Sequence, residues 1–522
     1  MLTGHDLMSF DPDIKRLWRI LLIALILWAA GVRLHGILVL KQGLSHDESV
    51  SYLCASATEG AYQIEIDGML DRDLHVMDIQ AFYARPPGMA FPTVARDLAL
   101  WDIHPPLYFW TLHAVHVAFG AGVIGGALLN FVAGLLLLAL VFIMAQRALA
   151  STSQALAAVA IWYLSPAVVQ IDLEARHYQF MALFAIASFL MAERLSNEQR
   201  SKTCWMLFTL VNAAGLLTHY YFAFLLLPGA LVMLIRYGWT RPTFTYAGSL
   251  LASLALFLLA FPQVFDFIGT YSERLSNPET TTGALDRIKT VTYASLAFFT
   301  EWHRARYMYI FLLIAAGLFA MYRIPRPIAQ LKFPLDRPVT HYGIALLWST
   351  CFTVGFYLVG ISPARPPGSS ISPTFWPLLA VLLVHAASRT IPARHVGWIF
   401  AAHMAQLPFA YHSSVHGSEY VKNVLPAEWY EEIGSADLLI TDDHKRANLP
   451  RIGSSLRAEQ ALFLYSKVVP AFKGEERVAF LHLAIDSRPA PNEIFVRMSE
   501  MGFRSDGPAK RHDHFELHYF RR

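Results

Sequence analysis

The chain has 522 residues, of which 55% are hydrophobic and only 16% are charged, and its mean hydropathy is positive. This balance excludes an ordinary soluble globular protein and predicts a membrane protein. The formal net charge of +3, without a lysine-rich tract, gives no reason to expect a nucleic-acid partner. Cys54, Cys204 and Cys351 lie far apart in the chain, so neither a disulfide framework nor a thiolate metal site is indicated.

Apolar segments near the length that crosses a bilayer recur from Leu17 to Tyr411. The first follows Lys15 and Arg16 and is longer than the core of a signal peptide, so we expect an uncleaved anchor. The segment 106–119 is shorter, and we expect it to lie along the outer membrane surface. We predict eleven spanning helices, at residues 17–40, 121–145, 153–171, 178–193, 203–218, 219–235, 244–266, 307–322, 342–361, 374–388 and 395–411.

The basic residues between the spans predict the orientation of the chain. Short loops rich in Lys and Arg face the cytoplasm. With 106–119 outside the membrane, the clusters near residues 15–19, 194–202, 236–241, 323–337 and 389–394 all fall on one side. The N-terminus is then cytoplasmic, and the tail from about residue 412 is external.

The predicted fold class is therefore a polytopic, all-α membrane bundle with a small external C-terminal α/β domain. We expect a membrane domain over 1–411, whose first external loop, 41–120, contains interfacial helices, and a soluble domain over 412–522. In the tail the patterns predict strands at 437–441, 477–485, 493–496 and 514–520, and helices at 427–433 and 454–466.

Two adjacent carboxylates follow the first span, in Ser45-His46-Asp47-Glu48. A positioned carboxylate can remove the proton of an alcohol, whose own pKa lies far above 7. Asp47 and Glu48 are therefore candidates for a catalytic base. A pair of solvated loop acids is the alternative.

Three further turns carry candidate binding groups. His104 lies in Asp102-Ile103-His104-Pro105-Pro106, where the prolines stiffen the chain, although a helix start is the alternative. Glu174 to Tyr178 and His219 to Tyr221 combine cationic groups with aromatic rings. A phosphate at headgroup depth needs such cations or donors, whereas an interfacial aromatic belt is the alternative. The candidates in these last two turns are Arg176, Tyr178, His219 and Tyr220.

Two other external loops are basic. The loop 267–306 contains Arg274, and a shorter loop carries Arg365 in an Arg-Pro-Pro-Gly turn. The basic side chains of 267–306 could bind a phosphate or contact lipid headgroups, and Arg365 could bind a phosphate or belong only to a turn. A divalent metal could assist, but the sequence shows no metal-ligand spacing, because His46, His104 and His219 meet only if the fold brings them together.

The order of these motifs, beginning with Arg33 late in the first span, resembles the GT-C glycosyltransferases, in particular the bacterial protein-O-mannosyltransferase-like family that includes the aminoarabinose transferases. The resemblance is good over about residues 15–265 and weaker to 411. It implies a bacterial inner-membrane enzyme that takes a sugar from a polyprenyl-phosphate donor. The acceptor would be a hydroxyl of lipid A, a glycan or a protein on the periplasmic face.

The resemblance also implies roles for individual residues. Asp47 would be the base and Glu48 would tune it or orient the acceptor. His104 would lie beside the same cavity, and Arg176, Tyr178, His219 and Arg274 would hold the donor phosphate. The reaction would be a direct displacement with inversion at the anomeric carbon.

A transporter or flippase of lipid-linked sugars is the rival class, because it would also be polytopic and bind a phosphate. Transporters, however, place ionisable groups near the middle of the bilayer. Here the predicted polar motifs gather on one face, which favours the enzyme.

Overall fold

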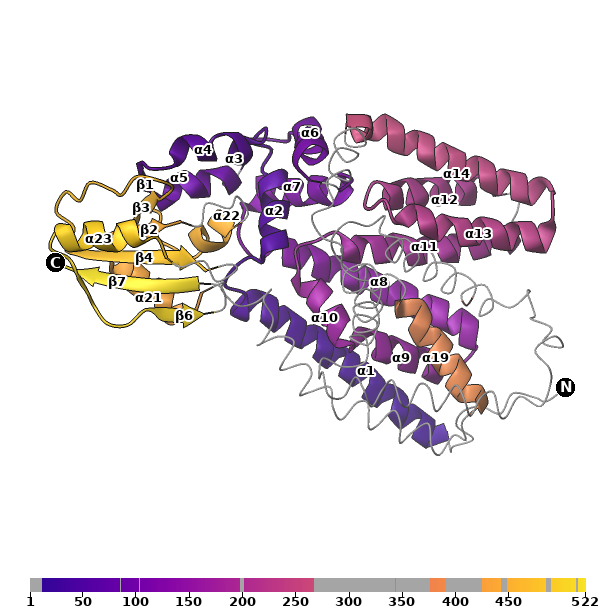
Figure 1. The fold of residues 1–522 in the computed structure, drawn as a ribbon. Helices are drawn as coiled ribbons and strands as arrows, with labels where there is room; N and C mark the ends of the chain where they lie inside the picture. The colour runs from indigo at the N-terminus through magenta and orange to yellow at the C-terminus, as the bar shows by residue number, and fades with distance from the viewer. Residues whose placement is uncertain are drawn as a thin grey trace, which may run out of the picture. The chain divides into compact units, whose positions relative to one another are not determined.

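The protein is described by a computed structural model over residues 12–84, 86–102, 104–197, 201–266, 343, 376–390, 425–442, 448–484, 490–512 and 515–522. Its elements fall into two compact units (Figure 1). The first unit comprises Met1–Gly36, His104–Tyr108 and Leu128–Gly417, and the second comprises Ile37–Ile103, Phe109–Ala127 and Ser418–Arg522.

The first unit is helical. Four described helices are long and apolar enough to cross a membrane, at Arg16–Leu40, Gly125–Leu149, Tyr178–Leu195 and Arg241–Ala260, and a bent pair makes up to five. The helices are α1 (Pro12–His35, continued by the π-helix η1, Gly36–Leu40), α8 (Gly125–Leu149), α9 (Thr152–Tyr163), α10 (Pro166–Leu173), α11 (Tyr178–Asn197), α12 (Lys202–Leu216), α13 (Phe222–Tyr237), α14 (Arg241–Ala260) and α19 (Trp376–Thr390).

Each predicted span that falls on described residues contains a helix. The helices α12, α13 and α19 have only 15, 16 and 15 residues, which is short for a full crossing. The predicted spans 307–322, 342–361 and 395–411 lie outside the described residues, residue 343 apart. The protein is thus a helical membrane protein with several candidate spans, and the total of eleven stays a prediction.

The predicted span 153–171 is two helices, α9 and α10, whose axes differ by 62°. Proline disfavours helical backbone at the residue before it, and Ser165, before Pro166, is extended with φ −60° and ψ 129°. The single predicted helix was wrong at this point, and Pro166 is the physical reason.

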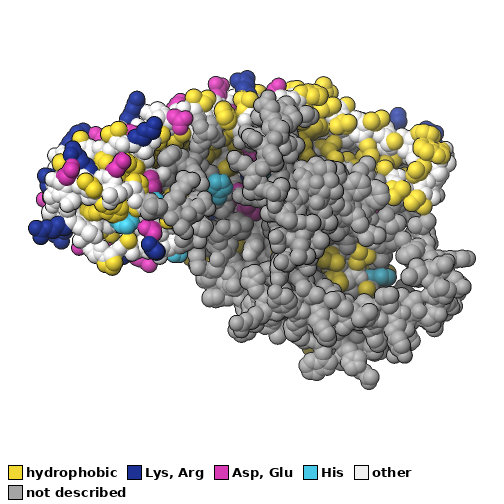
Figure 2. Space-filling view, in the orientation of Figure 1, with side chains coloured by type: hydrophobic (Ala, Val, Ile, Leu, Met, Phe, Trp, Pro, Cys, Tyr) yellow, Lys and Arg dark blue, Asp and Glu magenta, His cyan; other side chains and the backbone are white. Residues whose placement is uncertain are grey.

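The helices α11 to α14 lie side by side (Figure 1), and they combine buried apolar side chains with exposed ones. Leu195, Phe208 and Tyr246 are buried in one cluster between these helices. Leu251 and Leu259 of α14 are instead 68% and 79% exposed, and hydrophobic side chains gather over this part of the surface (Figure 2). An exposed apolar face of this kind is expected where a helix meets lipid.

The second unit combines short helices of the predicted first loop with a mixed sheet. The short helices are α2 (His46–Ala55), α3 (Ala61–Ile64), α4 (Ile66–Met69), α5 (Val76–Gln80), η2 (Ala81–Tyr83), α6 (Phe91–Trp101) and most of α7 (Leu107–Phe119). The tail adds helices α21 (Ala427–Ser435), α22 (Asn448–Gly453) and α23 (Asn492–Glu500). The 13-residue length of α7 agrees with the short segment expected at 106–119, whose position on the membrane surface stays a prediction.

The sheet has the strand order β1-β3-β2-β4-β7-β5, with β6 also paired to β7. The strands are β1 (Asp73–His75), β2 (Leu438–Thr441), β3 (Ala461–Leu464), β4 (Arg477–Leu483), β5 (Arg504–Ser505), β6 (Lys510–His512) and β7 (Phe515–Arg521). The central β3, β2 and β4 are parallel, and β1 pairs antiparallel with β3. The first loop therefore supplies an edge strand to a sheet made from the tail, whereas the sequence predicted a boundary between residues 411 and 412.

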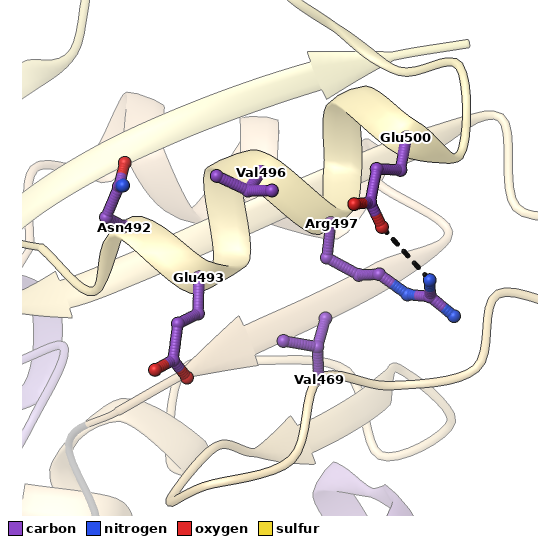
Figure 3. A pocket seen from close by; sticks show the side chains of 6 residues that line it. All are labelled: Val469, Asn492, Glu493, Val496, Arg497 and Glu500. Atoms are coloured by element: carbon purple, nitrogen blue, oxygen red, sulfur yellow. Dashed lines mark hydrogen bonds and ion pairs between the residues drawn. The ribbon is translucent and has the colours of Figure 1, made fainter.

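Two predictions for the tail were wrong. The segment predicted as a strand at 493–496 belongs to the helix α23, because Ile494 and Met498, four residues apart, bury one helix face in the sheet core. Figure 3 shows its opposite face, where Arg497 pairs with Glu500 at the rim of a surface pocket. The predicted helix at 454–466 contains the strand β3, whose short apolar run does not by itself distinguish helix from strand.

Candidate active site

The Asp47-Glu48 pair lies in the first turn of α2, in the second unit. Ser45 caps this helix: its hydroxyl accepts the N–H of Glu48 at 3.3 Å, and Oε2 of Glu48 accepts the N–H of Ser45 at 2.7 Å. This reciprocal arrangement is a capping box, which satisfies two backbone donors that a helix start leaves open.

The second oxygen of Glu48 is also engaged. Oε1 lies 2.8 Å from Nζ of Lys41, and both side chains are fully excluded from solvent. The contacts of Glu48 with Ser45 and Lys41 therefore stabilise the start of α2. Asp47, one residue earlier, is half-buried, and the partial positive charge at the helix N-terminus stabilises a carboxylate there.

Three interhelical turns of the first unit bring three histidines together. His104 precedes α7, His177 lies between α10 and α11, and His219 lies between α12 and α13. Ring centroids are 4.3 Å apart for His104 and His177, 4.7 Å for His177 and His219, and 5.6 Å for His104 and His219. The three residues are only 8%, 0% and 6% exposed in chain order, so the cluster is buried.

Hydrogen bonds to backbone carbonyls hold these turns in place. The N–H of Leu107 donates to the carbonyl of Leu217 at 2.8 Å, which joins the turn of His104 to the turn of His219. The side-chain amide of Asn130, on α8, donates to the carbonyls of Ile171, Glu174 and Arg176. Each turn is thereby tied to a neighbouring element.

The cluster combines positive charge with aromatic rings. Arg176 and Tyr178 flank His177 and are themselves buried, and the Tyr178 ring lies 4.4 Å from the His177 ring. Burial lowers the pKa of His177 well below its usual value, and the charges of His104, His219 and Arg176 lower it further. His177 is therefore neutral near pH 7, and its turn suits an anionic or metal ligand.

The predicted site residues have different outcomes. His104, Arg176, Tyr178 and His219 come from turns that the fold brings together, and their roles stay predictions. Tyr220 occupies the same turn as His219, but its ring contacts Phe257 on α14 at a centroid distance of 6.4 Å. Arg274 and Arg365 lie outside the described residues.

Sequence reasoning missed His177, although it lies inside the predicted Glu174–Tyr178 motif. It also missed Asp172, the single carboxylate of α10. Nε of Arg33 donates to Oδ2 of Asp172 at 2.5 Å, and both side chains are buried. The Arg33 guanidinium also stacks 3.8 Å from the Tyr163 ring and donates to the Tyr163 carbonyl. This pair joins α1 to α9 and α10, just before the turn of His177.

A comparison with known families matches part of the chain. Residues 103–264 match the family described as dolichyl-phosphate-mannose-protein mannosyltransferase. The matched segment contains Asp172 and all three histidines of the cluster. It confirms, over these residues, the predicted resemblance to the GT-C glycosyltransferases and indicates an enzyme of that class.

Solved structures of similar chains include ArnT from Cupriavidus metallidurans, in the apo state and bound to undecaprenyl phosphate. These are 12% and 13% identical, cover 96% of this chain and 97% and 98% of theirs, and have TM-scores of 0.48 and 0.49. The archaeal oligosaccharyltransferase AglB from Archaeoglobus fulgidus is 11% identical over 85% of this chain and 65% of its own, with a TM-score of 0.39. No sequence among the curated proteins matches this chain.

Proposed function

We propose that this chain, related over residues 103–264 to the dolichyl-phosphate-mannose-protein mannosyltransferases, transfers a sugar from a polyprenyl-phosphate carrier to an acceptor hydroxyl. The observation that carries the proposal is that the matched segment folds its polar motifs into one buried cluster, with Arg176 and three histidines on meeting turns. The family's name describes transfer from a lipid-linked phosphate sugar, and a cationic buried cluster suits that phosphate.

The donor phosphate is assigned to the turns of the first unit. A phosphate removed from water needs cations and N–H donors to replace its hydration. Arg176 supplies a fixed positive charge, and the imidazole rings of His104 and His219 supply nitrogen donors. Tyr178 and Tyr220 add hydroxyl groups on the same turns, and Arg274 and Arg365 are retained as candidates from the external loops.

Asp47 is proposed as the base. It removes the proton of the acceptor hydroxyl as that oxygen attacks the anomeric carbon, and the carbon–phosphate oxygen bond breaks with inversion of configuration. The departing polyprenyl phosphate is already a stable anion, so no general acid is required, and cations that face it lower the barrier further. Glu48 has both oxygens bound to Lys41 and Ser45, which supports a role in positioning the start of α2.

We place the enzyme in a bacterial inner membrane, with the N-terminus cytoplasmic and the C-terminal sheet on the periplasmic side. The distribution of basic residues between the spans supports this orientation. Lipid A, a surface glycan and a protein hydroxyl remain the proposed classes of acceptor, since each presents an alcohol close to the outer face.

The test compares envelope lipids, polysaccharide and glycoproteins by mass spectrometry in a deletion strain that carries the wild-type chain, Asp47→Asn or Asp67→Asn. Asp67 is an exposed acid of α4 and serves as the matched control. We expect one sugar-mass increment to return with the wild type and with Asp67→Asn, but not with Asp47→Asn at equal membrane abundance.

Two outcomes contradict the proposal. Full restoration by Asp47→Asn removes Asp47 as the base. No sugar increment on any acceptor, together with accumulation of the lipid-linked sugar on the cytoplasmic side in the deletion strain, favours a transporter or flippase.

A further inference from the structure

We propose that His104, His177 and His219 bind a divalent transition-metal ion, with zinc as the first candidate. One ring nitrogen from each residue lies within 4.8 Å of the corresponding nitrogens of the other two. Among the described residues this is the group of His, Cys, Asp and Glu side chains close enough to share an ion. Imidazole is a preferred ligand of zinc and of its first-row neighbours.

The geometry requires only a small closure of the rings. Zinc binds imidazole nitrogen at about 2.0–2.1 Å, which in a tetrahedral site separates two such nitrogens by about 3.3 Å. The observed upper limit of 4.8 Å therefore shortens by about 1.5 Å or less, within reach of side-chain rotation. The backbone stays fixed, because Leu107 and Asn130 hold the three turns through hydrogen bonds.

The packing of the cluster orients its rings, and a metal ligand must present an imidazole nitrogen in its neutral form. His177 is fully buried between His104 and His219, so its ring is held beside theirs. Nδ1 of His219 accepts the N–H of Tyr221 at 3.0 Å, which orients that ring. A metal bound at Nδ1 replaces this hydrogen bond, and a metal bound at Nε2 requires the ring proton to move to Nδ1, which also ends the hydrogen bond.

Three protein ligands are the arrangement of catalytic zinc sites, where a fourth position stays open for water or substrate. In this protein an anionic oxygen would take that position, and Arg176 on the same turn would contribute a second positive charge. If the proposed function holds, that oxygen belongs to the phosphate of the lipid carrier, and the metal stabilises the charge that develops there. Metal binding itself does not depend on the proposed function.

The experiment measures the metal on the full-length chain. The protein is purified in detergent through a tag without histidine, stripped with a chelator, incubated with zinc and desalted, and zinc is counted by mass spectrometry. His177→Gln and His104→Gln remove one ligand each. His512→Gln is the matched control, because His512 is exposed on β6, outside the cluster. Cobalt replaces zinc in a parallel sample, since tetrahedral cobalt absorbs visible light.

We expect about one zinc per wild-type and His512→Gln chain, and at least a tenfold loss in both cluster variants, consistent with one site of three ligands. Cobalt should give visible absorption bands in the wild type, but not in His104→Gln or His177→Gln. If His177→Gln fails to fold, His104→Gln decides: zinc should raise the Tm of the wild type but not of this variant.

Two results overturn the proposal. One is wild-type protein that retains no zinc or cobalt. The other is a folded His104→Gln or His177→Gln chain that retains as much metal as the wild type. Failure of sugar transfer by metal-loaded protein would count against the proposed function instead, and would leave the metal count unchanged.

Discussion

The buried ion pair between Lys41 and Glu48 supports a prediction that separates structural from catalytic roles at the Asp47-Glu48 motif. Glu48→Gln removes the charge but keeps an amide oxygen that can accept the N–H of Ser45, since Gln also serves in a capping box. Lys41 is then left buried without its carboxylate partner at 2.8 Å. We expect the free energy of unfolding to fall by about 3–5 kcal/mol.

A double-mutant cycle tests this reasoning. Glu48→Ala should lose about 1 kcal/mol more than Glu48→Gln, because it also removes the cap. Lys41→Met combined with Glu48→Gln should recover much of the loss, because neither charge is then buried alone. Glu65→Gln, at an exposed position of the same unit, is the control and should stay within about 0.5 kcal/mol of the wild type.

The assay is equilibrium unfolding of the chain in detergent, followed by tryptophan fluorescence, with sugar transfer measured at a temperature where every variant is folded. Folded Glu48→Gln should retain transfer activity, whereas Asp47→Asn should be stable and inactive. An unchanged stability for Glu48→Gln, or single-variant losses that simply add in the double variant, would refute the ion-pair argument. Complete inactivity of fully folded Glu48→Gln would give Glu48 a catalytic role.

Arg33→Met and Asp172→Leu should each lower the free energy of unfolding by about 3–5 kcal/mol, because either change leaves a buried charge without its counter-charge. Equilibrium unfolding should show that the double variant loses less stability than the sum of the two single losses. Gly134→Ala places a Cβ 2.8 Å from Oδ1 of Asp172 and 2.9 Å from Nε2 of Gln179, so a thermal melt should show a loss equivalent to about 1–3 kcal/mol. Burial raises the pKa of Asp97 on α6 to about 7. The folded chain then keeps a proton that the unfolded chain releases, so stability should fall as pH rises from about 4 to about 7, and Asp97→Asn should flatten this part of the pH profile.

Much of the helical architecture could be predicted from local sequence. Length and hydropathy locate helices because a segment that crosses a bilayer must satisfy its backbone hydrogen bonds internally, and this depends on the segment alone. The bend between α9 and α10 was not predicted, although Pro166, which disfavours helical backbone at Ser165, is a local signal for it. In the tail, by contrast, short apolar runs such as 461–464 fit a strand or a helix equally well.

The candidate site was predictable as separate motifs. His104, Arg176 and His219 drew attention because prolines, charges or paired aromatics interrupt an apolar chain. His177 did not stand out beside Arg176, because its importance comes from the His104 and His219 rings that approach it in space. Asp172 was missed for the same reason, since its partner Arg33 is on another helix.

The sequence by itself determined the class of protein, the positions of the long apolar helices in its described part and the turns that carry polar groups, because these follow from composition and periodicity over a few residues. Only the tertiary structure decided which polar groups meet. It joined Asp73–His75 to the strand at Ala461–Leu464 and gathered three histidines from three turns. It also paired Glu48 with Lys41, so that a carboxylate that the sequence made a candidate base lies in a buried ion pair. Such pairings depend on how whole elements pack, which local sequence does not encode.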